Sequence, residues 1–335
     1  MAKKYQNIND HVEPELKKKR MTLNPFENLY RKDGKGVEKD ELKVLDKPGI
    51  GNFFKLFRRR LNHIFSVNIL MIFGNFPIFF AMFALAYTTT DSLAPSSRMF
   101  PLLKGAAYFD PSPDTMALLG SFGAQDTAPV YSTATYVLLG LALLFVLTFG
   151  LVNVGTTYIL RNIIKGEPVF IMSDFKYAIK RNWKQGIIYG IIDLLLIVVL
   201  IYDVIYYRLN AGVSGLFSTM YFVGFGMIII YFFARMYAYP MIVTFDMKLT
   251  KILKNSIYFS VLGIKRNIMA LLGAVVFVLA DYILINIFLP IGIVIPFIIL
   301  LGLLQFIFVY AAFPKIKEIM IDPYYKEVEN TESAE

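Results

Sequence analysis

Six long apolar stretches dominate the chain and decide what it can fold into. Each is long enough to cross the hydrocarbon core of a bilayer, which takes about 20 residues in a helix. They lie at about 64–88, 134–160, 185–207, 214–240, 268–289 and 293–313. With 56% hydrophobic and 18% charged residues, the composition is typical of a membrane protein. The sequence predicts an all-α, polytopic membrane protein whose six-helix transmembrane bundle occupies residues 64–314.

The last two apolar stretches are separated only by the segment LPIGIVIP, in which Pro290, Gly292 and Pro296 are turn signals. A single helix over 268–313 would be much longer than a bilayer is thick. We therefore predict a tight hairpin at this segment.

The charges of the connections indicate how the spans are oriented. Connection 161–184 has six basic residues against two acidic ones, and connection 246–267 has five against one. Connection 89–132, by contrast, has two basic residues against four acidic ones. By the positive-inside rule, both termini are predicted to lie in the cytoplasm. The same rule accounts for the net charge of +9, so anionic lipids of the inner leaflet, and not nucleic acid, are the expected partner.

Four segments lie outside the predicted spans. Residues 1–50 are highly charged and are expected to be a largely flexible cytoplasmic tail. Residues 315–335 are expected to be a second cytoplasmic tail. Residues 51–63 combine apolar residues at helical spacing with a basic face. That pattern predicts an interfacial amphipathic helix, although a simple continuation of the first span fits it as well. The external loop 89–132 contains five prolines, and is either a functional cap or disordered.

The tetrapeptide IKRN occurs twice, at 179–182 and at 264–267, before the third and the fifth apolar stretch. The shift of 85 residues between the copies also places the second apolar stretch on the fourth. We interpret this as a parallel internal repeat, with an amphipathic cytoplasmic elbow helix before each IKRN. Basic and aromatic side chains of the elbows are predicted to anchor the chain at the inner interface: Lys180, Arg181, Trp183, Lys265 and Arg266. Two groups of tyrosines are also predicted to be interfacial: Tyr202, Tyr206 and Tyr207, and Tyr231, Tyr237 and Tyr239.

Three polar residues, Asn153, Asp193 and Arg235, lie within predicted spans two, three and four. Each is eight to eleven residues from the inner-side charge on its own span, which places all three roughly 12–16 Å deep. Placing an ionisable group at such depth costs about 2.5–3.5 kcal/mol on insertion scales, so each charge is expected to have a compensating interaction. Either Asp193 and Arg235 pair, with Asn153 nearby, or Arg235 extends its side chain to the inner interface. Asp281, Asn286 and Asn75 are predicted to lie further outward, where they either form a second polar patch or, as is more expected, make hydrogen bonds between helices.

No catalytic or metal-binding pattern is found. The chain has no cysteine and only two histidines, so zinc thiolate sites and cysteine nucleophiles are excluded and histidine-based sites are not expected. None of the common hydrolase, metalloprotease or phosphate-loop motifs is present. The sequence therefore predicts neither an enzyme nor a cofactor.

Three segments together resemble the YesL-like family of bacterial membrane proteins: VNILMIFGNFPIFFAMFAL at 67–85, YILRNIIKGEPVFIMSDFKYAIKRNWKQGIIYG at 158–190 and MYAYPMIVTFDMKLTKILKNSIYFSVL at 236–262. The resemblance covers about 60–314. The tail 1–50 and the loop 89–132 depart from the family pattern. The family has no assigned function, and the resemblance implies an association with carbohydrate uptake.

Two classes of function follow from these observations. The first is a non-enzymatic accessory or scaffold component beside a sugar importer of the ABC type, whose subunits would be its partners. The second is a small-molecule transporter or channel, with self-association as a dimer. A permease subunit of an ABC importer is disfavoured, because connection 161–184 lacks a Glu-Ala-Ala coupling sequence.

Overall fold

The computed structural model describes residues 48–86, 88–95, 98–123 and 125–324. The chain divides into two units, residues 1–56 and residues 57–335. Almost all of the predicted tail 1–50 lies outside the described residues, as does the end of the second tail, 325–335. The described part of the first unit forms most of helix α5 (Ile50–Arg59), in which Phe53 is buried.

Helix α5 is not a continuation of the first span. It ends at Arg59, and α6 (Leu61–Gly74) begins beyond Arg60, whose φ of −110° and ψ of 18° are not helical. The sequence left both alternatives open for 51–63, and the break at Arg60 favours a separate helix. Its location at a membrane surface stays a prediction.

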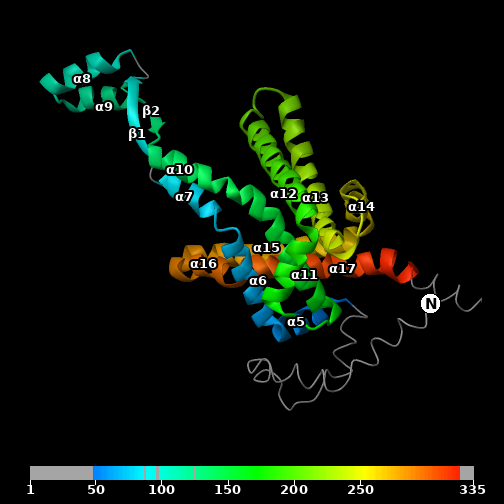
Figure 1. Cartoon of the computed structure of the whole chain (residues 1–335). Coiled ribbons are helices and arrows are strands. Elements are labelled where there is room, and N and C mark those ends of the chain that lie inside the picture. The colour runs from blue at the N-terminus through cyan, green and yellow to red at the C-terminus, as the bar shows by residue number, and fades with distance from the viewer. Residues whose placement is uncertain (1–47, 87, 96–97, 124, 325–335) are drawn as a thin grey trace, which may run out of the picture. The chain divides into compact units, whose positions relative to one another are not determined.

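The described part of the second unit is almost entirely helical (Figure 1). Five of its helical segments are long and apolar enough to cross a membrane: Thr133–Lys165, Ile171–Leu209, Gly215–Thr244, Ile264–Ile287 and Leu289–Tyr324. They comprise α10 (Thr133–Ala142) with α11 (Leu144–Lys165), α12 (Ile171–Leu209), α13 (Gly215–Thr244), α15 (Ile264–Ile287), and the run α16 (Leu289–Ile295), η2 (Pro296–Leu300), α17 (Leu301–Ile316) and η3 (Lys317–Ile321). The prediction of an all-α, multi-span protein is confirmed at this level. The last helical run reaches Tyr324, so residues 315–324 are helical, and the location of this segment in the cytoplasm stays a prediction.

The first predicted span, 64–88, is not one straight helix. It consists of α6 and α7 (Ile78–Ala86), which are bent by 58° at a short break. Pro77 lies in that break, where it lacks a backbone N–H and disfavours helical dihedrals at the preceding residue. Among the described residues, five helical segments are therefore able to span a membrane, or six if α6 and α7 together form one span.

The predicted hairpin between the last two spans is present, but its turn lies earlier than expected. Helix α15 ends at Ile287, and the chain turns at Phe288 (φ −146°, ψ 84°). The predicted turn sequence instead forms α16, with Pro290 in its first turn, where a missing N–H leaves no helical hydrogen bond unmade. A Cβ on Gly292 would lie 2.4 Å from the Ile285 backbone nitrogen, so the tight return requires glycine here.

A π-helical turn in the last helical run is held by Asn68 of α6. The Asn68 side chain is fully buried. Its Nδ2 donates to the carbonyls of Pro296 at 3.1 Å and Phe297 at 2.7 Å, and its Oδ1 accepts from the Gly302 N–H at 2.8 Å. Because π-helical turns leave backbone groups outside the regular α pattern, this one amide both satisfies them and ties α6 to α17.

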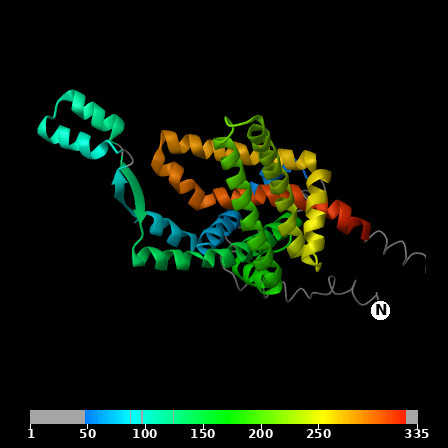
Figure 2. The ribbon, with the colours of Figure 1, turned by 90° about the horizontal axis from the view of Figure 1, so that it is seen from above.

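Loop 89–132 is ordered over its described residues. Strand β1 (Thr89–Pro95) pairs antiparallel with β2 (Gln125–Val130), starting from Thr89 opposite Val130. Between the strands lie α8 (Phe100–Phe109) and α9 (Pro113–Phe122), which run side by side at the end of the ribbon (Figures 1 and 2). The described residues of this loop therefore form regular secondary structure, and a functional external cap stays a prediction.

Both copies of IKRN lie at helix breaks. In α12, Asn182 has φ −115° and ψ 18°, and its Nδ2 donates to the Ala178 carbonyl at 3.0 Å. The second elbow is a separate helix, α14 (Leu249–Leu262), followed by a break at Gly263. Asn267 donates to the Ser260 carbonyl at 2.9 Å. One break lies at the last residue of the motif and the other just before its first residue, so the two copies are not equivalent and the repeat stays a prediction.

Helices α11 and α12 approach each other closely at three glycines. A Cβ on Gly150 would lie 2.0 Å from the Gly186 carbonyl oxygen and 2.7 Å from the Gly190 Cα. Small residues four apart on one helix face allow such backbone contact between membrane helices. This contact brings α12 against α11, on which one member of the candidate site lies.

Candidate functional site

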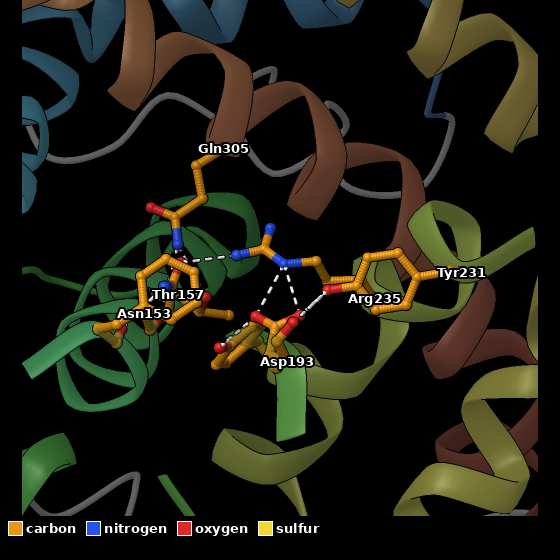
Figure 3. Close-up of polar contacts among 8 residues, drawn as sticks. Asn153, Thr157, Asp193, Tyr231, Arg235 and Gln305 are labelled. Atoms are coloured by element: carbon orange, nitrogen blue, oxygen red, sulfur yellow. Dashed lines mark hydrogen bonds and ion pairs between the residues drawn. The ribbon is translucent and has the colours of Figure 1, made fainter. Parts of the chain in front are cut away.

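A buried polar cluster lies among α11, α12, α13 and α17 (Figure 3). Helices α11, α12 and α13 pack against one another, and α17 packs on both α11 and α13. The three residues that the sequence singled out, Asn153, Asp193 and Arg235, are brought together here, one from each of the first three helices.

Asp193 is at the centre of this cluster, and its side chain is fully inaccessible to solvent. Arg235 Nε donates to both carboxylate oxygens, at 3.0 Å and 2.9 Å. The Tyr239 hydroxyl donates to Oδ2 at 2.7 Å, and the Tyr231 hydroxyl donates to Oδ1. A buried charge is tolerated when it is paired and hydrogen-bonded, and Asp193 meets both conditions.

Arg235 connects Asp193 to the rest of the cluster. Its Nη2 lies 3.5 Å from Asn153 Oδ1, and its guanidinium lies over the rings of Phe149 and Tyr239 at 5.7 Å and 5.3 Å. Both rings lie within the range of cation–π attraction. The arginine therefore does not extend its side chain to the inner interface, which was the alternative that the sequence left open.

Gln305 of α17 completes the cluster on the side away from Tyr231 (Figure 3). Its Nε2 donates to Thr157 Oγ1 at 3.0 Å and lies 3.5 Å from the Asn153 carbonyl. Its Oε1 is buried and has no hydrogen-bond partner among the described residues. Beside it is a cavity of about 20 Å³ lined by Arg235, Tyr239, Asn153 and Thr157 together with apolar side chains. This volume suffices for about one water molecule.

The contacts within the cluster join α11, α12, α13 and α17 to one another. Its two charges neutralise each other, the hydroxyls of Tyr231 and Tyr239 donate to the carboxylate, and the Asn153 amide oxygen faces the guanidinium. Among the described residues, no group of three or more His, Cys, Asp or Glu is placed to hold a metal ion.

The predicted interface anchors lie apart from the cluster, near the two elbows. Lys180, Arg181, Trp183 and Lys265 are exposed, and Arg266 is half-buried. Their position at a membrane interface stays a prediction.

The prediction of interfacial tyrosines is wrong for one of the two groups. Tyr237 and Tyr239 are buried, and the hydroxyls of Tyr231 and Tyr239 bind Asp193. The sequence did contain the signal, because Tyr231, Arg235 and Tyr239 are spaced by four and therefore share one face of a helix. Tyr237 of α13 instead contacts the end of the second elbow, where its hydroxyl donates to Asn267 Oδ1 at 2.7 Å.

Two further polar residues have roles that the sequence did not predict. Arg161, counted there as a loop charge, is buried in α11 and donates to the Val243 carbonyl at 2.6 Å. Its guanidinium thus supplies a hydrogen-bond donor to a carbonyl near the carboxyl end of α13, where cations are favoured. Gln305 was missed because no pattern within one helix reveals that α17 packs on α11.

The second polar patch does not form between helices. Asn75 and Asn286 donate to carbonyls of their own helices, those of Met71 and Tyr282. Asp281 is buried, and its Oδ1 has no partner among the described residues. The expected hydrogen bonds between helices are thus not made by these side chains.

Comparison with known proteins matches one part of the chain. A family model described as a protein of unknown function, DUF624, matches residues 130–204. The matched region contains α10, α11 and most of α12, and so includes Asn153 and Asp193 but not Arg235 or Gln305. No curated protein and no solved structure matches. Over its second and third apolar stretches, the chain is therefore similar to a protein family of unknown function.

Proposed function

We propose that this chain is a non-enzymatic, multi-pass protein of the bacterial cell membrane with both termini in the cytoplasm. In this proposal it is a YesL-like accessory or scaffold component of a membrane complex that takes up carbohydrate. The match to the DUF624 model is consistent with the YesL-like resemblance. The carbohydrate context is supported by that resemblance alone.

The observation that carries the proposal is how little space adjoins the polar cluster. Asp193 is inaccessible and bound by three side chains, and the adjacent cavity is about 20 Å³. Pockets for small molecules are typically about 300–1,000 Å³. The membrane-depth charges thus serve to hold helices together, which suits a partner protein better than a conduit.

A surface suited to a partner protein lies on the α8–α9 hairpin. Both helices lack buried residues, and Tyr108 and Phe109 are 83% and 87% exposed. Aromatic side chains are enriched where interfaces concentrate their binding energy. In the proposal this hairpin contributes to partner binding together with the basic elbows.

A transporter or channel, formed as a dimer, is the second candidate. It is favoured by the unpartnered Gln305 Oε1 and by the 22% exposure of the Arg235 side chain, which lines the small cavity. A second copy would have to enlarge this cavity into a passage.

Affinity purification from native membranes separates the two candidates. We expect the tagged full chain to carry subunits of a carbohydrate importer in fixed ratio. The double variant Tyr108→Ser/Phe109→Ser is expected to recover about fivefold less of them, because an interface aromatic typically contributes more than about 1 kcal/mol. The control Tyr282→Ser removes a tyrosine that is 62% exposed on α15, and should recover the wild-type amount. A chain that purifies without partners, and that alone gives saturable sugar flux in liposomes, would instead establish the transporter.

A further inference from the structure

A second, larger hollow lies at the first elbow, apart from the polar cluster. Its volume is about 410 Å³. It is lined by residues 181–185 of α12 and by Phe245 and Asp246, which follow α13. Gln185 Nε2 donates to the Met247 carbonyl at 2.8 Å, so its two walls are joined by a direct hydrogen bond.

The lining of this elbow hollow is cationic and aromatic. Arg181 and Lys184 contribute two positive charges and Asp246 one negative charge. Within the described residues, neither basic side chain forms an ion pair. Trp183 is 51% exposed, and the Lys184 ammonium lies 5.5 Å from the centre of its ring. The hollow is left with one net positive charge, which matches a single phosphodiester.

The surface that continues from the hollow is apolar. Counting along α12 from Lys184, the exposed side chains at positions +4, +11, +15 and +18 share one helix face. These are Ile188, Leu195, Val199 and Tyr202, each more than half exposed. A cationic hollow with a tryptophan, followed by an exposed apolar stripe, has the chemistry of a headgroup site with acyl chains below it.

We propose that the elbow hollow binds the phosphodiester of an anionic glycerophospholipid, with its acyl chains along the Ile188–Tyr202 stripe of α12. Arg181 and Lys184 hold the phosphate, Trp183 covers the glycerol region, and Asp246 accepts a hydrogen bond from a headgroup hydroxyl. This site shares no residue with the polar cluster or with the α8–α9 hairpin, but it lies at the first basic elbow, which the proposed function also assigns to partner binding.

Trp183 is the single tryptophan of the chain, so intrinsic tryptophan fluorescence reports on this hollow alone. The purified full chain in dodecyl maltoside is titrated with dioleoylphosphatidylglycerol, with dioleoylphosphatidylcholine and with sodium phosphate. We expect a saturable change in emission with phosphatidylglycerol only. Inorganic phosphate lacks acyl chains for the stripe, and phosphatidylcholine carries no net charge. If phosphate alone saturates the signal, or phosphatidylcholine does so equally well, the lipid assignment is wrong.

Two charge-matched variants test which residues bind. Arg181→Gln/Lys184→Gln is expected to raise the phosphatidylglycerol concentration at half-saturation about tenfold or more, since each basic residue near an anionic lipid surface contributes about 1 kcal/mol. Lys251→Gln/Lys254→Gln removes two exposed charges of α14 outside the hollow, and should leave it within about twofold because exposed distant charges are screened. Equal shifts in the two variants would show general attraction of lipid to a basic surface, and would overturn the proposed site.

Discussion

Replacing Asp193 by asparagine is expected to lower the free energy of unfolding by about 3–5 kcal/mol, the range for breaking a buried ion pair. The substitution keeps the size of the side chain but leaves the Arg235 guanidinium between Asn153 and two aromatic rings without its counter-charge. Arg235→Gln should be similarly destabilising, because it leaves the fully buried carboxylate with only two tyrosine hydroxyls. The measurement is the thermal unfolding midpoint of the purified chain in detergent.

The same helix provides a matched control for this prediction. Asp203→Asn removes a carboxylate of α12 that is half-buried and outside the cluster, and is expected to change the midpoint little. The double variant Asp193→Leu/Arg235→Met removes both charges, and should be less destabilised than either single variant. If Asp193→Asn and Arg235→Gln each unfold at the wild-type temperature, the ion pair is not a clamp.

Replacing Gly150 by alanine is expected to destabilise the contact between α11 and α12 by about 1–3 kcal/mol, the usual cost of overpacking. The new methyl group would lie 2.0 Å from the Gly186 carbonyl oxygen and 2.7 Å from the Gly190 Cα. Both are backbone atoms, so neither can move aside as a flexible side chain would. The helices must separate, and the thermal unfolding midpoint should fall.

Replacing a glycine that has no neighbouring atoms is expected to change the stability in the opposite direction. Gly226 lies within α13, and a Cβ there would meet nothing within 4 Å. Because alanine favours a helix over glycine by up to about 1 kcal/mol, Gly226→Ala should be neutral or slightly stabilising. A Gly150→Ala variant that behaves like Gly226→Ala would contradict the close helix contact.

Much of the helical organisation could be predicted from the sequence, because a membrane span needs a long apolar run whatever its surroundings. The meeting of Asn153, Asp193 and Arg235 at one level of the bundle could be predicted by counting residues in a helix of known rise. Where the helix bounds differ from those predicted by hydropathy, a proline within the apolar run is the cause. Pro77 interrupts the first span, and Pro290 starts a helix where a turn was expected.

Only part of the cluster could be predicted from the sequence, because Tyr231, Tyr239 and Gln305 join it through packing between helices. Tyr231 and Tyr239 could have been linked to Arg235 by their spacing of four, but tyrosine near a span end is more common at an interface. Gln305 could not have been found, because its contact with Thr157 joins residues 148 positions apart. The secondary structure of loop 89–132 could not be predicted either, since β1 and β2 pair residues that are 30 to 41 positions apart along the chain, from Pro95 with Gln125 to Thr89 with Val130.

Cysteine accessibility at Thr157 tests most directly whether the polar cluster is closed, which is the central claim. The chain has no cysteine, so one introduced thiol is the only site for a membrane-impermeant methanethiosulfonate reagent. Thr157 is 1% exposed beside the small cavity, and Ser173, exposed at the start of α12, provides a control of similar size. With both membrane faces open to the reagent, Ser173→Cys is expected to be labelled and Thr157→Cys to remain unlabelled. Labelling of Thr157→Cys at a rate comparable to that of Ser173→Cys would reveal a water-filled path at the cluster, and would contradict the account.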